Sequence, residues 1–163
     1  MYFKAFTSLI EKKPLIVTRF VDGDGIILKD FYSNKEIEIR FYGIDAPEIT
    51  NCKKVNKDEK ETMIPASLLR ELGRKSLYFL MEQIKIGDEC TLIQEMQNQK
   101  DKYGRDLGYV VMEDGRVLNE IMIKEGYAKP YNEVYCDMLP KYQEYYLQAK
   151  INKKGLFSIT NHF

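Results

Sequence analysis

The chain has 163 residues, of which 44% are hydrophobic and 31% charged, and this composition is typical of a single globular domain over residues 1–163. The 25 basic and 25 acidic side chains leave no net charge, so attraction to a polyanion has to come from a local patch and not from the overall field. No apolar run approaches the length of a membrane span, so no association with a membrane is expected.

The three cysteines are scattered and odd in number, without the spacing of a zinc site or a disulfide framework, which favours a reducing interior. Residues 1–15 mix charged side chains with short apolar stretches and lack the apolar core and cleavage site of a signal peptide. A cytoplasmic location is therefore expected. The alternative is a secreted protein whose leader has been removed.

Residues 15–42 are expected to form three β-strands joined by turns. The first strand lies between Ile16 and Val21, the second covers residues 26–28, and the third covers residues 37–42, where apolar and polar side chains alternate. The segments between them, residues 22–25 and residues 32–35, are rich in residues that favour turns. A three-stranded meander follows.

The second half of the chain mixes helices with two more strands. The charge-dense residues 50–63 are expected to form a loop. Helices are expected over residues 65–86, 117–124 and 140–153, and strands over residues 90–93 and 107–112, with a polar hairpin over residues 95–105. Five strands with a helix after the third predict an α+β fold that is mainly β, a five-stranded Greek-key barrel of the OB type with three helices. A plain α+β sandwich would give a similar order, but the order favours the barrel.

The first chemical motif is Asp-Gly-Asp-Gly at residues 22–25. Taken alone, it would be a turn between two strands, and Asp22 is interpreted in that way. Asp24 stands at the start of the next strand, where the neighbouring glycines let the backbone approach a ligand closely, so Asp24 is the better candidate for a metal ligand.

The second motif covers residues 40–48 and contains an arginine followed by two acids. Arg40 on its own would be an exposed strand residue paired with Glu38. Asp45 ends the strand, and Pro47 favours an extended backbone that leaves the Ala46 carbonyl available. Asp45 and Glu48 could merely solvate a loop. A functional role is favoured because an arginine, and a second strand that carries a carboxylate, are expected nearby.

The third motif is Asp-Lys-Tyr-Gly-Arg at residues 101–105. Lys102, Tyr103 and Arg105 provide an ammonium, an aromatic ring and a guanidinium in one turn, which a phosphate site would explain, although a polar hairpin tip is the alternative. Tyr131 is a candidate for stacking on a base, and packing is the competing explanation for any one of the twelve tyrosines.

Together, the three motifs supply what cleavage of a phosphodiester requires in a chain whose only histidine, His162, lies at the tail. Acids can hold a hard cation, one acid can take a proton, and guanidinium groups can bind the phosphoryl oxygens.

In order and spacing, the motifs resemble those of the staphylococcal nuclease (thermonuclease) family over residues 16–157. The resemblance implies a five-stranded OB barrel with three helices and calcium-dependent hydrolysis of DNA and RNA. It also implies that Asp24, Asp45 and the Ala46 carbonyl bind Ca²⁺, and that Glu48 acts on or orients the attacking water.

For the substrate, the resemblance implies that Arg40 and Arg105 neutralise the phosphoryl oxygens while the 5′ oxygen leaves, which gives 3′-phosphate products. Lys102 and Tyr103 correspond to positions that contact a substrate phosphate, and Tyr131 aligns loosely with a base-stacking position. The expected substrates are single-stranded or unstructured DNA and RNA, and the expected state is a monomer.

The sequence departs from the family pattern at two positions where threonine is common. Ala46 is harmless if only its carbonyl is used, whereas Gly25 removes a hydroxyl that could orient a ligand or a metal-bound water. A catalytically silent OB module that binds nucleic acid or protein is the alternative, as is an interaction domain unrelated to nucleic acid. Retention of all the acids and both arginines favours the enzyme.

Overall fold

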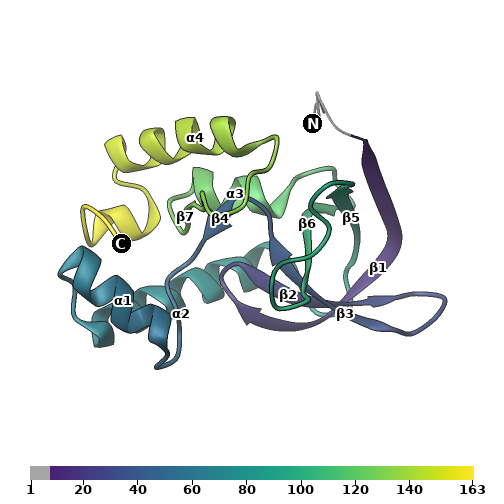
Figure 1. Cartoon of the computed structure of the whole chain (residues 1–163), viewed down its shortest axis with the longest axis horizontal. Helices are drawn as coiled ribbons and strands as arrows, with labels where there is room; N and C mark the ends of the chain where they lie inside the picture. Colours follow the sequence, from purple (N-terminus) through teal and green to yellow (C-terminus); the bar gives the residue numbers. More distant parts are fainter. Residues whose placement is uncertain (1–7) are drawn as a thin grey trace.

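The computed structural model describes residues 8–163, and its central feature is a closed barrel of five strands (Figure 1). Around the barrel the order is β1 (Leu9–Asp22), β2 (Gly25–Asp30), β3 (Glu36–Phe41), β6 (Asp106–Met112) and β5 (Glu89–Glu95). β3 pairs with β6 in parallel, and the other neighbours are antiparallel. The predicted five-stranded barrel in an α+β fold is confirmed. Of the segment interpreted as lacking a signal peptide, residues 1–7 lie outside the described part.

β1 is longer than the strand expected from the sequence, because it begins at Leu9. Its first half pairs with β5 and its second half with β2, and shifts in register after Lys12, Val17 and Phe20 let it bend around the barrel. Side chains in the first half alternate between exposed and half-buried, so no apolar periodicity marks this part of the strand in the sequence.

The three predicted helices are present as α2 (Ala66–Gln83), α3 (Leu118–Lys124) and α4 (Leu139–Ile151), and a short 3-10 helix, η1 (Gly155–Ser158), follows α4. A fourth helix, α1 (Lys53–Thr62), forms where the sequence predicted a loop over residues 50–63, so that prediction was wrong. Lysine and glutamate suit a helix, but Val55 is the only buried side chain of α1, so the segment contains too few apolar residues to indicate a packed helix.

A two-stranded sheet follows the C-terminal end of β3. This sheet was not predicted from the sequence. It pairs β4 (Ile44–Asp45) with β7 (Lys129–Pro130), and the backbone N–H of Tyr131 donates to the Gly43 carbonyl at 2.9 Å. This pairing brings the segment that carries Tyr131 next to Asp45.

Two hydrophobic cores support these elements. The larger fills the barrel and continues under α3 and α4, and the smaller joins Val55 of α1 to Leu69 and Leu72 of α2 and to the C-terminal residues. Figure 1 shows the four helices and the C-terminus gathered at one side, away from the β2–β3 hairpin. No helix within residues 8–163 is both long and apolar enough to cross a membrane.

Candidate active site

The turn between β1 and β2 positions the first carboxylate. The Asp24 backbone N–H donates to Asp22 Oδ1 at 3.1 Å, which is the local turn expected of Asp22. Glycine is required at position 23, since a Cβ there would lie 2.7 Å from the Ser76 Cβ and 2.8 Å from the Ala46 Cβ. The turn therefore packs directly against the segment that follows β4, and Asp24 is directed toward it.

Arg40 lies at the centre of a cluster that it forms with Asp24 and Asp45, here called the arginine–aspartate cluster. Only 8% of the surface of Arg40 is exposed. Its Nη2 atom lies 3.1 Å from Asp45 Oδ1 and 3.4 Å from Asp24 Oδ2, and its Nη1 atom donates to the Ile44 carbonyl at 2.7 Å. The interpretation of Arg40 as an exposed partner of Glu38 is therefore wrong. β3 ends at residue 41, and the following segment folds back over the arginine.

The charge of Asp24 is stabilised although the side chain is buried. Burial alone would raise its pKa, but the Arg40 guanidinium and further donors hold the pKa of Asp24 below its usual value. Asp24 Oδ2 also accepts a hydrogen bond of 2.7 Å from the Ala46 backbone N–H. For Asp22, burial and the nearby Asp24 charge raise the pKa to about 8.

Lys54, on α1, joins the acids of the second motif. Its Nζ atom lies 2.8 Å from Asp45 Oδ1, 3.1 Å from Glu48 Oε1 and 3.3 Å from the Ala46 carbonyl oxygen. Burial works against its positive charge, but Asp45, together with the other nearby carboxylates, raises the pKa of Lys54 above its usual value. The sequence interpretation missed this residue because it placed the whole segment in a solvated loop.

Arg105 is held on the opposite side by its own loop. Asp101 Oδ1 accepts the backbone N–H groups of Tyr103 and Arg105, each at 2.9 Å, and Asp101 Oδ2 accepts Arg105 Nε at 2.7 Å. The ring of Tyr103 is 73% exposed and lies close to the cationic groups of both Lys102 and Arg105. Arg105 is thus paired with Asp101 and not with the acids of the first two motifs, Asp24, Asp45 and Glu48.

A hollow of about 160 Å³ lies between the two arginines. The Tyr131 ring covers Arg40, whose guanidinium carbon lies 5.1 Å from the ring centroid, and the Tyr131 hydroxyl bonds to Glu133 at 3.0 Å. The predicted arginines and substrate residues line this hollow together: Arg40, Lys102, Tyr103, Arg105 and Tyr131.

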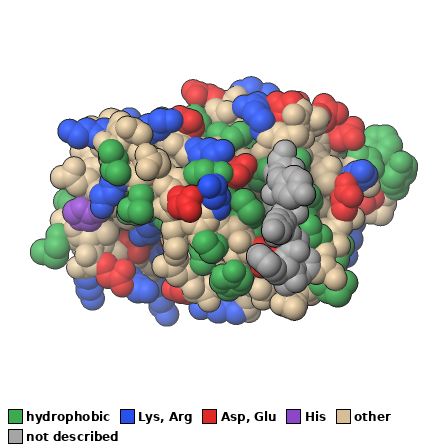
Figure 2. Space-filling view, turned by 90° about the horizontal axis from the view of Figure 1, so that it is seen from above, with side chains coloured by type: hydrophobic (Ala, Val, Ile, Leu, Met, Phe, Trp, Pro, Cys, Tyr) green, Lys and Arg blue, Asp and Glu red, His purple; other side chains and the backbone are tan. Residues whose placement is uncertain are grey.

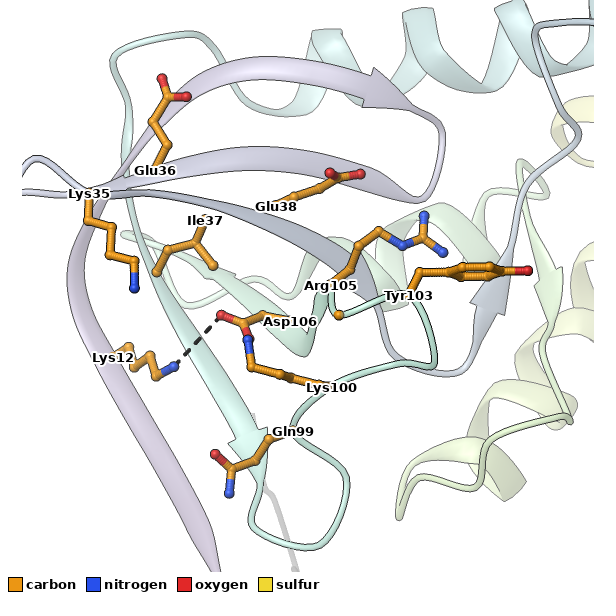
Figure 3. Close-up of a pocket in the computed structure, with 11 residues that line it drawn as sticks. Lys12, Lys35, Glu36, Ile37, Glu38, Gln99, Lys100, Tyr103, Arg105 and Asp106 are labelled. Carbon is orange, nitrogen blue, oxygen red and sulfur yellow. Dashed lines mark hydrogen bonds and ion pairs between the residues drawn. The ribbon is translucent and has the colours of Figure 1, made fainter.

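A second hollow, of about 380 Å³, adjoins the first, because Tyr103 and Arg105 line both. Figure 3 shows Lys12, Lys35 and Lys100 directed toward its centre around the buried Asp106. Lys100 Nζ lies 2.8 Å from Asp106 Oδ1 and Lys12 Nζ lies 3.9 Å from Asp106 Oδ2. This lysine-lined groove shares Tyr103 and Arg105 with the third motif, but its three lysines come from separate segments that no motif joins.

The oxygen atoms around Lys54 have the chemistry that a hard divalent cation prefers. The carboxylates of Asp45 and Glu48 and the carbonyl of Ala46 already surround one positive group, the Lys54 ammonium. Within residues 8–163, no three carboxylate, imidazole or thiol side chains are arranged to hold a metal ion by themselves. A metal here would therefore need the Ala46 carbonyl as well as the carboxylates.

The closed five-stranded barrel is of the OB type, and it carries a buried arginine between two aspartates with a second arginine across a hollow. The family model described as "Staphylococcal nuclease homologue" matches residues 38–159. The chain belongs to this family.

Several known proteins are similar to the chain. It is 34% identical over 146 residues to endonuclease YhcR of Bacillus subtilis, and the match covers 90% of the chain but 11% of YhcR. It is 33% identical over 143 residues to an uncharacterized endonuclease of Escherichia coli, covering 87% of the chain and 75% of the relative. It is 26% identical over 155 residues to the thermonuclease of Staphylococcus intermedius, covering 92% of the chain and 81% of the relative.

Proposed function

We propose that the chain is a calcium-dependent nuclease that acts, as a monomer, on single-stranded or unstructured DNA and RNA. The observation that carries the proposal is Arg40, which is buried against Asp24 and Asp45 and still lines a hollow together with Arg105. The endonuclease and thermonuclease names of the relatives support the same activity. The three cysteines are free thiols, which supports a reducing compartment such as the cytoplasm.

Asp24, Asp45 and the Ala46 carbonyl would hold the Ca²⁺. When bound, the ion supplies electrostatic stabilisation of negative charge without demanding a fixed geometry. Glu48 is the proposed group that orients the attacking water and accepts its proton. Its side chain is 24% exposed, so water can reach it.

The arginines act on the phosphoryl group. Arg40 and Arg105 donate hydrogen bonds to its oxygens while negative charge develops, and departure of the 5′ oxygen leaves a 3′-phosphate. Arg40 is preorganised because main-chain carbonyls and carboxylates fix its guanidinium. Arg105 is held less tightly, by one ion pair with Asp101 and by the exposed Tyr103 ring, and can turn toward a substrate.

Lys102, Tyr103 and Tyr131 are the proposed substrate-binding residues. Lys102 and the exposed Tyr103 stand at the rim of the hollow, where a phosphate would meet an ammonium and a base would meet an aromatic face. Tyr131 covers Arg40 and borders the same hollow, so it would contact the nucleotide nearest the reacting phosphate.

The alternative is a catalytically silent OB module that binds nucleic acid or protein. Such a module has no need for a buried arginine between two aspartates, whose desolvation is costly unless every partner is present. Retention of that cluster favours the enzyme.

The deciding experiment is incubation of denatured DNA with the protein in Ca²⁺ and in excess chelator, followed by end-group analysis. The proposal expects cleavage in Ca²⁺ only, with 3′-phosphate and 5′-hydroxyl ends. Absence of cleavage in Ca²⁺ at high protein concentration would favour the silent module, and 5′-phosphate ends would refute the proposed direction of bond breaking.

A further inference from the structure

Lys54 places a positive charge among the oxygen atoms that are the proposed metal ligands. We infer that its ammonium group is a resident cation of the site, which competes with the divalent metal for Asp45 and the Ala46 carbonyl and, in the absence of metal, also pairs with Glu48. The inference rests on the proposed function for the identity of the ligands, and concerns what this chain adds to the site.

The contacts of Lys54 leave no room for a second cation in the same place. Its Nζ atom lies 2.8 Å from Asp45 Oδ1, 3.3 Å from the Ala46 oxygen and 3.1 Å from Glu48 Oε1. Calcium binds oxygen ligands at about 2.3–2.6 Å, so an ion on the same oxygens would overlap the ammonium and be strongly repelled by it. Metal and lysine can therefore occupy this position only in turn.

The charges of the cluster explain why a cation is needed when no metal is present. Asp24, Asp45 and Glu48 converge from separate segments, and Arg40 contacts the first two of them only. Lys54 supplies the missing positive charge at Asp45 and Glu48. Without it, carboxylates with little access to water would face one another, which is costly in a folded protein.

The helix that carries Lys54 lets the ammonium leave without unfolding. The next residue, Val55, is fully buried and anchors α1 in the smaller core, so the backbone at position 54 is fixed. The Lys54 side chain is itself 33% exposed. A long flexible lysine stem can swing to solvent by rotation about its own bonds, so displacement by a metal requires only a side-chain movement.

The test is the affinity for Ca²⁺ measured by calorimetry on the full chain without nucleic acid. Lys54→Met removes the competing charge but keeps the apolar stem, and is expected to bind Ca²⁺ roughly tenfold more tightly than the unchanged protein. Lys54→Arg keeps the charge and should keep the weaker affinity. Circular dichroism verifies that each variant is folded.

Lys57→Met is the matched control, because it removes the same charge from the same helix. Lys57 is 62% exposed and its ion pair is with Glu61 at 3.7 Å, away from the cluster. Competition at the site predicts little change in this variant. Equal tightening in both methionine variants, or no tightening in Lys54→Met, would overturn the inference, as would the absence of Ca²⁺ binding to either protein.

A second measurement follows the ammonium itself. Acylation of each lysine is followed by mass spectrometry. Lys54 should be acylated slowly without metal and faster once Ca²⁺ displaces its ammonium group, whereas the rate of acylation of Lys57 should not change. Unchanged labelling of Lys54 at saturating Ca²⁺ would contradict displacement. Neither measurement uses a nucleic acid, so the two proposals can fail separately. Ca²⁺ binding without cleavage would refute the proposed nuclease activity alone, whereas cleavage in Ca²⁺ with unchanged affinity in Lys54→Met would refute this inference alone.

Discussion

At the scale of single residues, Arg40 and Arg105 carry the same group in two different settings. Arg40 is fixed by two main-chain carbonyls and two buried carboxylates, so it is part of the fold as well as of the site. Arg105 belongs to an exposed turn and is held by an ion pair with Asp101 and by the Tyr103 ring. A substitution at position 105 therefore separates catalysis from stability, whereas a substitution at position 40 would not.

Arg105→Ala is expected to lower turnover by about a hundredfold or more, because one preorganised donor to the developing charge is lost. The melting temperature should change little, since Asp101 keeps its bonds from the backbone N–H groups of Tyr103 and Arg105. Steady-state cleavage rates and thermal unfolding check both statements. An unchanged rate would remove Arg105 from the mechanism.

Glu95 gives a prediction on the dependence of stability on pH. Burial raises the pKa of Glu95, even though Tyr109 and the Asp137 backbone N–H bond to its carboxylate. The folded state therefore keeps the proton to higher pH than the unfolded chain, and this group makes stability fall as pH rises above its ordinary pKa of about 4.3.

Glu95→Gln keeps an oxygen acceptor and removes the titration. Its free energy of unfolding should decline less than that of the unchanged protein as the pH rises from 4, by at most about 1.4 kcal/mol per pH unit. Urea unfolding over a pH series, in the presence of chelator, measures the difference. Parallel curves for the two proteins would show that Glu95 is charged normally in the fold.

At the scale of elements, predictability follows how many side chains each element buries. β2, β3, β5, β6 and the three predicted helices each bury at least two apolar side chains, so the sequence indicates them. α1 buries Val55 alone and was therefore interpreted as a loop. β4 and β7 are two residues long and exist only because they pair with each other, a tertiary contact without a local signal.

Val55→Ala tests whether α1 depends on that one buried side chain. The lost packing should destabilise the helix by roughly 1–2 kcal/mol and speed hydrogen exchange of residues 53–62. Exchange in the barrel strands should stay slow, because the barrel has a core of its own. Asn56→Ala, at the exposed neighbouring position, is the control. Equal protection of α1 in both variants would show that other contacts hold the helix.

At the scale of the whole molecule, local arrangement matters more than net charge. Figure 2 shows acidic and basic side chains interspersed on one face, in keeping with the neutral sequence. The sequence motifs contain all three residues of the arginine–aspartate cluster, and the structure shows Arg40 in contact with Asp24 and Asp45. Lys54 and the lysine-lined groove were missed, because segments distant in sequence assemble them only in the folded chain.

The lysine-lined groove leads to a prediction on binding. Lys35 lines this groove at the end away from Tyr103 and Arg105 (Figure 3), where a strand that leaves the first hollow past these two residues would continue. If the strand follows this path, Lys35→Gln should weaken binding of a single-stranded oligonucleotide and reduce the slope of log affinity against log salt by about 0.7, the value for one lost phosphate contact.

Fluorescence anisotropy in chelator, over a salt series, measures this slope without cleavage. Lys150→Gln is the matched control, since Lys150 lies on α4, at the other side of the molecule from the β2–β3 hairpin (Figure 1). Its slope should equal that of the unchanged protein. An unchanged slope in Lys35→Gln would place the strand elsewhere, because a phosphate held by Lys35 cannot be lost without a change in the number of released ions.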